Sequence, residues 1–308
     1  MEQLKSTLKQ IDGKGYKAYK KLKGIYQFDG YRLSIDHVQG DPYAAASRIS
    51  IHVPTDAAQF NRALWSTAVR KIALEDFLAR AVHRAIRTHV KGNRGLGKSG
   101  QINIATSGQQ ILTRNALLVD NQSIEARLTV GLPARGRTIL SLEAAAIFLH
   151  ELPNVIRDSL YSANSDNTVL IKHIECAENQ VALREELSRK NLVAFIADGA
   201  HLPRRSGIDD RPLEHGCIAF TSPKSLRSNI DLPNGEKIKG MGIPAGVTLV
   251  VGGGFHGKST FLHAIERGIY NHIPNDGRER VVTNPLAVKV RAEDGRVIND
   301  VDINPFIS

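Results

Sequence analysis

Apolar side chains recur along the 308-residue chain first at helical spacing and then in alternation. Residues 2–24 begin with one apolar face and continue into a lysine-rich stretch, which predicts a helix followed by a turn. Residues 25–35 alternate around Asp29-Gly30, a pair typical of a tight hairpin turn. We expect a further strand at 48–53 and helix over 58–90.

The pattern continues with short strands and then helices. We expect strands at 102–104, 111–112 and 123–130, a helix at 139–152, further helices with gaps to residue 190, and an apolar run at 192–196. Runs of strands followed by helices are typical of a mixed α/β architecture. The sequence therefore predicts an N-terminal α/β domain over residues 1–200.

The composition changes after residue 200, where a charged, irregular linker begins. Residues 222–238 predict a hairpin, and residues 247–251 are apolar apart from one threonine, as expected of a parallel strand covered on both faces. The following helix carries one apolar stripe, formed by Phe261, Leu262, Ile265 and Ile269. With a strand at 287–291 and a turn at 293–295, residues 201–308 predict part of a second α/β domain.

A glycine loop joins the strand at 247–251 to that helix. Residues 252–259 match the G-x-x-x-x-G-K-[ST] pattern, in which backbone N–H groups and a helix N-terminus cradle phosphates. Lys258 is expected at the β- and γ-phosphates, and the Ser259 hydroxyl at Mg²⁺. ATP and Mg²⁺ are thus the expected ligands, held by Gly252, Gly253, Gly254, Phe255, His256, Gly257, Lys258, Ser259 and Thr260.

A second stretch, residues 92–99, satisfies the same pattern in a different setting. It follows a helix and leads into the alternating residues 101–104, so no helix N-terminus is expected behind it. We interpret it as a connecting loop, or as a mobile basic loop that contacts a nucleic-acid backbone or a protein partner.

The charge of the chain favours a polyanionic partner without requiring one. The net charge is +10 and the isoelectric point is about 9.6. Tyr16 and Tyr19 lie among lysines and could stack bases, but a solvated helix face with two half-buried tyrosines is the favoured interpretation. The candidate nucleic-acid contacts are Lys98, Arg94, Arg80, Arg84 and Arg87, of which the last three share a helical stripe that could also be simply solvated.

Other chemistry is sparse. Cys176 and Cys217 are far apart in sequence, which predicts no disulfide framework and favours a reducing compartment. The spacing of Asp36, His37 and Asp41 fits no standard metal site, so side-chain hydrogen bonds within a loop are expected there. We find no signal peptide and no apolar segment long enough for a bilayer, and therefore expect a cytoplasmic protein without membrane contact.

Hydrolysis of ATP needs an acidic residue at the end of a second apolar strand and a group that orients water. No such strand follows Ser259, and the nearest carboxylates, Asp294, Asp300 and Asp302, lie in turn-like sequence. No catalytic residue can be assigned, so the sequence predicts nucleotide binding and leaves hydrolysis open.

Six segments carry a resemblance that spans nearly the whole chain: 35–43, 94–100, 130–137, 240–260, 270–279 and 291–296. Through them the chain resembles the predicted ATPases of the ABC class, a soluble family. The resemblance implies a family-specific N-terminal α/β domain, a partial ABC-type P-loop nucleotide-binding domain, a homodimer and a plausible RNA partner. The family continues into a signature segment and a Walker B strand, which are absent here. The resemblance thus implies a truncated chain, or completion by another chain.

Three hypotheses follow. The first is an ABC-class ATPase, or its N-terminal part, that binds ATP at 252–260. The second is a nucleic-acid-binding module whose nucleotide site is structural or regulatory. The third, a P-loop kinase, fits less well because no acceptor-binding lid is visible in the sequence.

Overall fold

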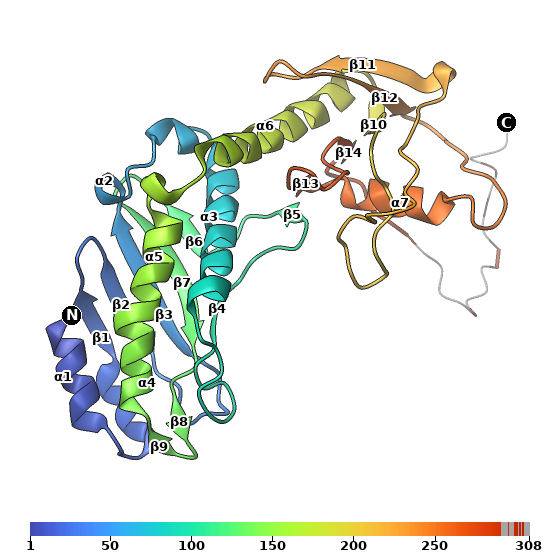
Figure 1. Cartoon of the computed structure of the whole chain (residues 1–308). Helices are drawn as coiled ribbons and strands as arrows, with labels where there is room; N and C mark the ends of the chain where they lie inside the picture. The colour runs from blue at the N-terminus through green and yellow to red at the C-terminus, as the bar shows by residue number, and fades with distance from the viewer. Residues whose placement is uncertain (291–294, 296–298, 301, 303, 305–308) are drawn as a thin grey trace.

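The computed structural model describes residues 1–290 together with residues 295, 299, 300, 302 and 304. Two α/β parts are joined by the long helix α6 (Asn167–Arg189), which runs from one part to the other (Figure 1). The start of α6 packs into the core of the first part through Leu170 and Ile174, and its end packs into the second through Leu183 and Leu187. One helix therefore contributes to both cores.

The first part is built on a six-stranded antiparallel sheet, in the order β1-β2-β3-β7-β4 with β6 paired to β7. Its strands are β1 (Gly24–Gln27), β2 (Arg32–His37), β3 (Ser47–Pro54), β4 (Ile102–Ile104), β6 (Leu117–Val119) and β7 (Ser123–Val130). Along β7 the side chains of Ile124, Ala126 and Leu128 are buried and alternate with more exposed ones, so one face of the sheet meets the core.

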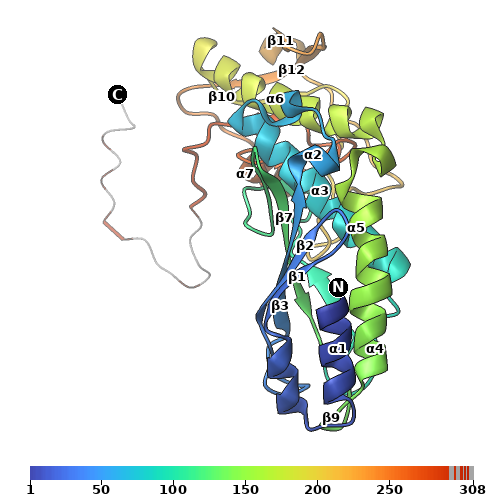
Figure 2. The same cartoon turned by 90° about the vertical axis from the view of Figure 1, so that its left-hand side faces the viewer.

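Helices line this sheet, and α1 packs beside α4 (Figure 2). The helical elements of the first part are α1 (Glu2–Ile11), η1 (Tyr16–Leu22), α2 (Thr55–Ala58), η2 (Arg62–Trp65), α3 (Ala68–His89), α4 (Ser141–Ala146), the π-helical η3 (Ile147–Glu151), α5 (Leu152–Leu160) and η4 (Ser162–Asn164). The apolar face expected near the N-terminus is confirmed, because Leu4, Leu8 and Ile11 are buried. The helix expected over 58–90 is confirmed only from Ala68 onward, because α2 ends at Ala58 and residues 59–67 contain no helix other than the short η2.

The second part is a four-stranded antiparallel sheet with a helix on each face. Its order is β11-β12-β10-β14, formed by β10 (Leu192–Ala197), β11 (Arg227–Asp231) after η5 (Lys224–Leu226), β12 (Lys237–Pro244) and β14 (Val281–Thr283). Phe195 faces α6, whereas Ile196 shares a core with Ala264 of α7 (Lys258–Arg267). The run at 192–196, expected in the first domain, is thus an inner strand of the second sheet.

A two-stranded ribbon connects the parts. β5 (Gln110–Ile111) leaves the first part on a long loop and pairs antiparallel with β13 (Asn271–His272), which follows α7 (Figure 1). A second small ribbon, β8 (Ala134–Arg135) with β9 (Thr138–Ile139), lies at the far end of the first part.

Two expected strands do not form. Residues 247–251 belong to no strand, and neither do residues 287–290. The reason at 247–251 is the lack of hydrogen-bonded neighbours in the part of the chain that the structure describes. Arg291, the last residue of the expected strand at 287–291, and the turn residues Glu293 and Asp294 lie outside the described residues.

Candidate phosphate-binding site

The glycine loop at 252–257 contains three residues with positive φ, a conformation found in loops that bind anions through backbone N–H groups. Gly252, Phe255 and Gly257 have φ angles of +153°, +61° and +83°, and Gly257 directly precedes α7. Positive φ values turn successive N–H groups toward the same side of the loop. The strand-to-helix setting predicted for Lys258 is confirmed on its helix side, since α7 begins at this residue.

The Lys258 ammonium lies over this loop. Its Nζ donates to the carbonyl oxygens of Gly252, at 2.6 Å, and Gly253, at 2.5 Å. The His256 ring packs against Gly253, where an added Cβ would lie 3.1 Å from the ring Cε1. The positive charge is therefore already held at the mouth of the loop, where phosphate oxygens would replace two neutral carbonyls as partners.

The donors present fit nucleotide phosphates and a magnesium ion. Within the described residues, no carbonyl or side chain accepts a hydrogen bond from the N–H groups of residues 253–257. They are joined by the N-terminus of a ten-residue helix and by the exposed Ser259, whose hydroxyl is a Mg²⁺ ligand of the kind expected here. No carboxylate in the described part of the chain pairs with Lys258 or Ser259, so the arrangement supplies binding groups and no catalytic base.

The segment leading into the loop is apolar and exposed. Val247, Leu249 and Val251 are 93%, 82% and 74% exposed. They line one side of a groove of about 1270 Å³, whose other walls include Ile218, Phe220 and Met241. The expectation of a strand covered on both faces is wrong for the described structure. Phe220 stacks on Phe261 at 6.3 Å, which places it against the core.

The apolar stripe expected on α7 is also only partly present. Ala264 is fully buried and Phe261 and Ile265 pack against the second core, but Leu262 is 53% exposed. Sequence reasoning missed what holds the far end of the helix, namely Arg184 of α6 and Thr283 of β14. Neither residue carries a motif, and only the topology brings them to α7.

The second match to the pattern, residues 92–99, is a tightly packed structural loop. A Cβ at Gly100 would lie 2.0 Å from the Gly92 carbonyl oxygen, and one at Gly97 would lie 2.4 Å from that of Pro42. The Lys98 N–H donates to Pro42 at 3.0 Å, and the loop leads into β4 instead of a helix. Its glycines therefore allow close backbone packing, and no phosphate cradle forms.

Two of the candidate nucleic-acid contacts are engaged inside the molecule. Arg94 is buried and donates to Glu143 at 2.7 Å and to Glu151. Arg80 pairs with Asp76 at 2.7 Å and donates to two backbone carbonyls of the loop at 105–112. Arg84 lies 5.9 Å from the centre of the Phe77 ring, and only Arg84, Arg87 and Lys98 of the five candidates are exposed.

A larger group of exposed cations lies at the end of the molecule away from α7. Tyr16 and Tyr19 are buried there and donate to the carbonyl oxygens of Leu132 and Pro133, so the base-stacking interpretation of these tyrosines is wrong. The Tyr16 N–H donates to Arg137, which joins η1 to the β8–β9 ribbon. The exposed cations, here called the basic tip, are Lys14, Lys17, Lys20, Lys21, Lys23, Lys98, Arg135 and Arg137.

Two further candidates for chemistry are structural. Asp36 accepts from the hydroxyls of Ser34 and Ser50, both at 2.6 Å, and Asp41 accepts from two backbone N–H groups, as the loop interpretation expects. Among the described residues, no group of three or more His, Cys, Asp or Glu side chains could hold a metal.

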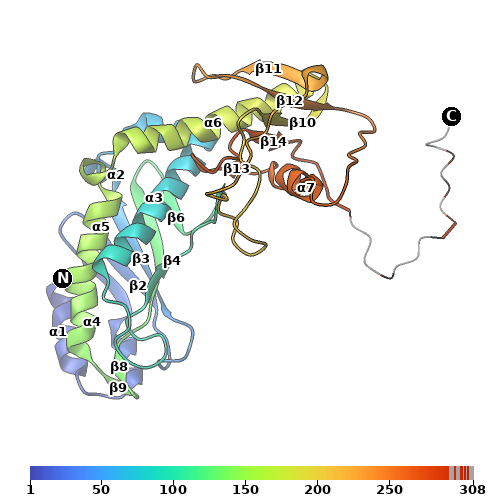
Figure 3. The same ribbon diagram turned by 45° about the vertical axis from the view of Figure 1, so that its right-hand side comes forward.

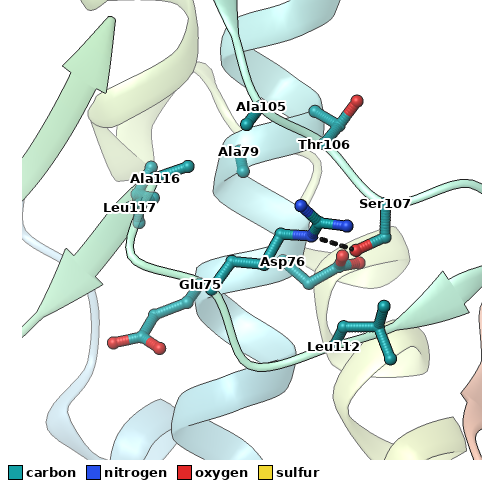
Figure 4. Close-up of a pocket in the computed structure, with 10 residues that line it drawn as sticks. Glu75, Asp76, Ala79, Ala105, Thr106, Ser107, Leu112, Ala116 and Leu117 are labelled. Carbon is teal, nitrogen blue, oxygen red and sulfur yellow. Dashed lines mark hydrogen bonds between the residues drawn. The ribbon is translucent and has the colours of Figure 1, made fainter.

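A small cavity beside α3 contains two buried carboxylates, Glu75 and Asp76 (Figure 4). Its volume of about 10 Å³ suits one water molecule. Glu75 accepts the N–H of Val119 at 2.9 Å, and Arg114 donates to Ser107 at 3.1 Å, both of which also line the cavity. We assign no ligand to it.

In the part of the chain that the structure describes, no helix has both the length and the apolar character needed to cross a bilayer.

Comparisons with known proteins match two successive parts of the chain to two family descriptions. Residues 1–163 match a family described as the N-terminal part of ATPases of the ABC class, and residues 166–308 match a P-loop domain. An uncharacterized protein of Methanocaldococcus jannaschii is 34% identical over 125 residues, which cover 37% of this chain and 27% of that relative. The match thus spans about a quarter of the relative.

The two family matches meet near the start of α6, so α6 and β10 go with the P-loop domain. A P-loop domain in this family supports nucleotide binding. The family match to the N-terminal part covers more than half of the sequence and is followed directly by the second match. The chain therefore belongs to the ATPases of the ABC class.

Proposed function

We propose that the chain binds ATP together with Mg²⁺ at residues 252–260. The observation that carries the proposal is a set of N–H groups before α7 that have no acceptor among the described residues, with the Lys258 ammonium lying over the same loop. The backbone groups and Lys258 bind the phosphates, and Ser259 holds the metal, whose bound charge offsets that of the phosphates. Hydrolysis needs a carboxylate beside Ser259, and none pairs with Ser259 among the residues that the structure describes.

Matched lysine substitutions test this assignment. We expect Lys258→Ala to weaken binding of a fluorescent ATP analogue by about 10- to 100-fold, because a hydrogen bond to a charged group is lost. Lys98→Ala changes the other lysine of the same sequence pattern and should leave the affinity unaltered. If only Lys98→Ala abolished binding, the nucleotide would bind at residues 92–99 and our assignment to residues 252–260 would be wrong.

A second function, contact with a nucleic-acid backbone, is favoured by the basic tip. Its eight exposed cations form no ion pair within the described residues, whereas Arg80 and Arg94 are paired internally. We therefore propose that the basic tip, and not the arginine stripe on α3, contacts the nucleic acid. Lys98 belongs both to the basic tip and to the candidates predicted from the sequence. RNA is the partner that the family resemblance favours.

Salt dependence distinguishes this contact from incidental charge. Binding of a single-stranded RNA should weaken steeply with salt, and the slope should fall when Lys17, Lys20 and Arg137 are changed to glutamate. Lys224→Glu, an exposed lysine on the second part, is the control and should leave the slope nearly unchanged. Equal effects of both variants would show that the net charge of the chain, and not the basic tip, determines RNA binding.

We also propose the homodimer that the family resemblance implies. Sedimentation with and without ATP would test it.

A further inference from the structure

The carboxyl end of α7 is held by two other elements. The carbonyl oxygen of Gly268, which follows the helix, accepts from the Thr283 N–H at 3.0 Å and from Nε and Nη2 of Arg184 at 3.2 and 3.1 Å. The Thr283 hydroxyl donates to Ile265 at 2.7 Å. A Cβ at residue 268 would lie 2.7 Å from that hydroxyl, so the close approach needs glycine. This end of α7 is fixed, whereas its loop end is exposed.

The same face of α6 also holds the strand that follows. Arg184 donates through Nη1 to the Asn271 side chain, at the start of β13. One turn earlier on α6, Gln180 donates to the His272 carbonyl at 2.9 Å and accepts the His272 N–H at 2.7 Å. Gln180 is fully buried, so these bonds are shielded from water. Burial lowers the pKa of Arg184 to about 10, which leaves it charged at neutral pH.

β13 continues this connection into the first part of the molecule. It pairs with β5, and the Ile273 N–H donates to the Gln109 carbonyl at 2.9 Å. The loop that carries β5 lies beside α3 (Figures 1 and 3). Arg80 of α3 holds this loop in turn, since it donates to the carbonyls of Gly108 at 2.8 Å and Gln110 at 3.0 Å. Hydrogen bonds thus run without a gap from the end of α7 to α3.

We propose that Arg184 is a positioning residue for the phosphate site, and that residues 268–273, called the joint, link this site to the loop at 105–112. The inference rests on the proposed nucleotide binding. α7 is a rigid element about 15 Å long, so a shift of its N-terminus on binding phosphates also moves its C-terminus. There Arg184 and Thr283 resist movement, and any displacement is passed through β13 to β5. The planar fork of arginine reaches Gly268 and Asn271 together, which a lysine ammonium cannot reproduce.

Amide hydrogen exchange of the full chain, with and without ATPγS and MgCl₂, tests the link. In the wild type we expect exchange at 105–112 and 269–273 to slow by about fivefold on adding the nucleotide, with no change in the hairpin at 24–37. In Arg184→Lys the slowing at 105–112 should disappear while ATPγS still binds. A purely structural role would raise exchange at 105–112 equally with and without ATPγS, and this outcome would overturn the proposal.

A second variant protects the test against misfolding. Asn271→Ala removes the side-chain acceptor of Arg184 at a partly exposed position, and the slowing at 105–112 should again be reduced. Calorimetry with ATPγS separates the two levels of inference. If the wild type binds ATPγS and exchange at 105–112 does not change, the link is wrong and the nucleotide site stands. If the wild type does not bind, both are wrong.

Discussion

The chain contains one glycine–lysine–serine pattern twice, and the two copies do different things because of what surrounds them. At 92–99 the glycines allow backbone to approach backbone, and the buried Arg94 ties the loop to Glu143 and Glu151. At 252–259 an added Cβ would meet nothing within 4 Å at Gly254 and Gly257, and only side-chain atoms at the other two glycines. A helix begins directly behind this loop. The pattern places glycines, which have no Cβ, at fixed positions of a loop. Whether that freedom serves packing or ligand binding is decided by the next element.

The largest difference between the loops should appear on adding a single methyl group. Gly100→Ala forces a Cβ to within 2.0 Å of the Gly92 carbonyl oxygen at a φ of +85°. We expect it to lower the free energy of unfolding by about 3 kcal/mol or more. Gly254→Ala, with no atom within 4 Å of the new Cβ, is the matched control. Its effect on the urea midpoint should stay within about 0.5 kcal/mol, and similar losses in both variants would contradict the comparison.

Removing the Arg94 side chain should have the next largest effect. Arg94→Ala leaves the Glu151 carboxylate, which is only 14% exposed, without its main partner. Breaking a buried pair costs about 3–5 kcal/mol, but Glu143 is 38% exposed, so we expect a loss of about 2–3 kcal/mol in urea unfolding. Arg157→Ala removes an arginine from an exposed pair and should cost less than about 1 kcal/mol. Equal losses would mean that burial does not distinguish the two pairs.

Local signals account for the elements that the sequence predicts correctly. The Asp29-Gly30 turn fixes the β1–β2 hairpin, and the spacing of Leu4, Leu8 and Ile11 fixes α1, because each depends on neighbours within a few residues. The helix after Lys258 follows from its loop in the same way. The nucleotide-site residues remain a prediction, since their geometry fits phosphates and only a binding measurement tests them.

Features that depend on partners distant in the chain cannot be predicted from local sequence patterns. Arg80, Arg84 and Arg87 share a helical spacing, but Arg80 turns toward Asp76 and the carbonyls of a loop almost thirty residues later. The strand expected at 111–112 overlaps β5 (Gln110–Ile111), but no local pattern marks β13 or indicates that these two strands pair across the two parts. The apolar run at 247–251 indicates burial correctly as a tendency, but burial needs neighbours, and the described residues do not provide them.

The ion pair between Glu151 and Arg94 of the loop at 92–99 should make a smaller, pH-dependent contribution to the free energy of unfolding. Burial alone would raise the pKa of Glu151, but hydrogen bonds from Arg94 and from the Lys91 N–H outweigh it, so the pKa lies below its usual 4.5. A carboxylate with a lowered pKa stabilises the folded state above about pH 4.5, and this contribution is lost as the pH falls through the folded value. Glu151→Gln should therefore be about 1–2 kcal/mol less stable than the wild type at pH 7. The difference should shrink below pH 4.5, and a constant difference from pH 7 to pH 3 would contradict the assignment.

The smallest effect is expected just before the phosphate loop. Leu249 is 82% exposed, so Leu249→Thr should change the free energy of unfolding by no more than about 0.5 kcal/mol. Ile196→Thr introduces the same hydroxyl into a fully buried position of β10 and should cost about 2–3 kcal/mol. Both are measured by urea unfolding at two protein concentrations. A large, concentration-dependent loss in Leu249→Thr would show that this segment is covered in solution by another copy of the chain, because only a buried leucine can lose that much.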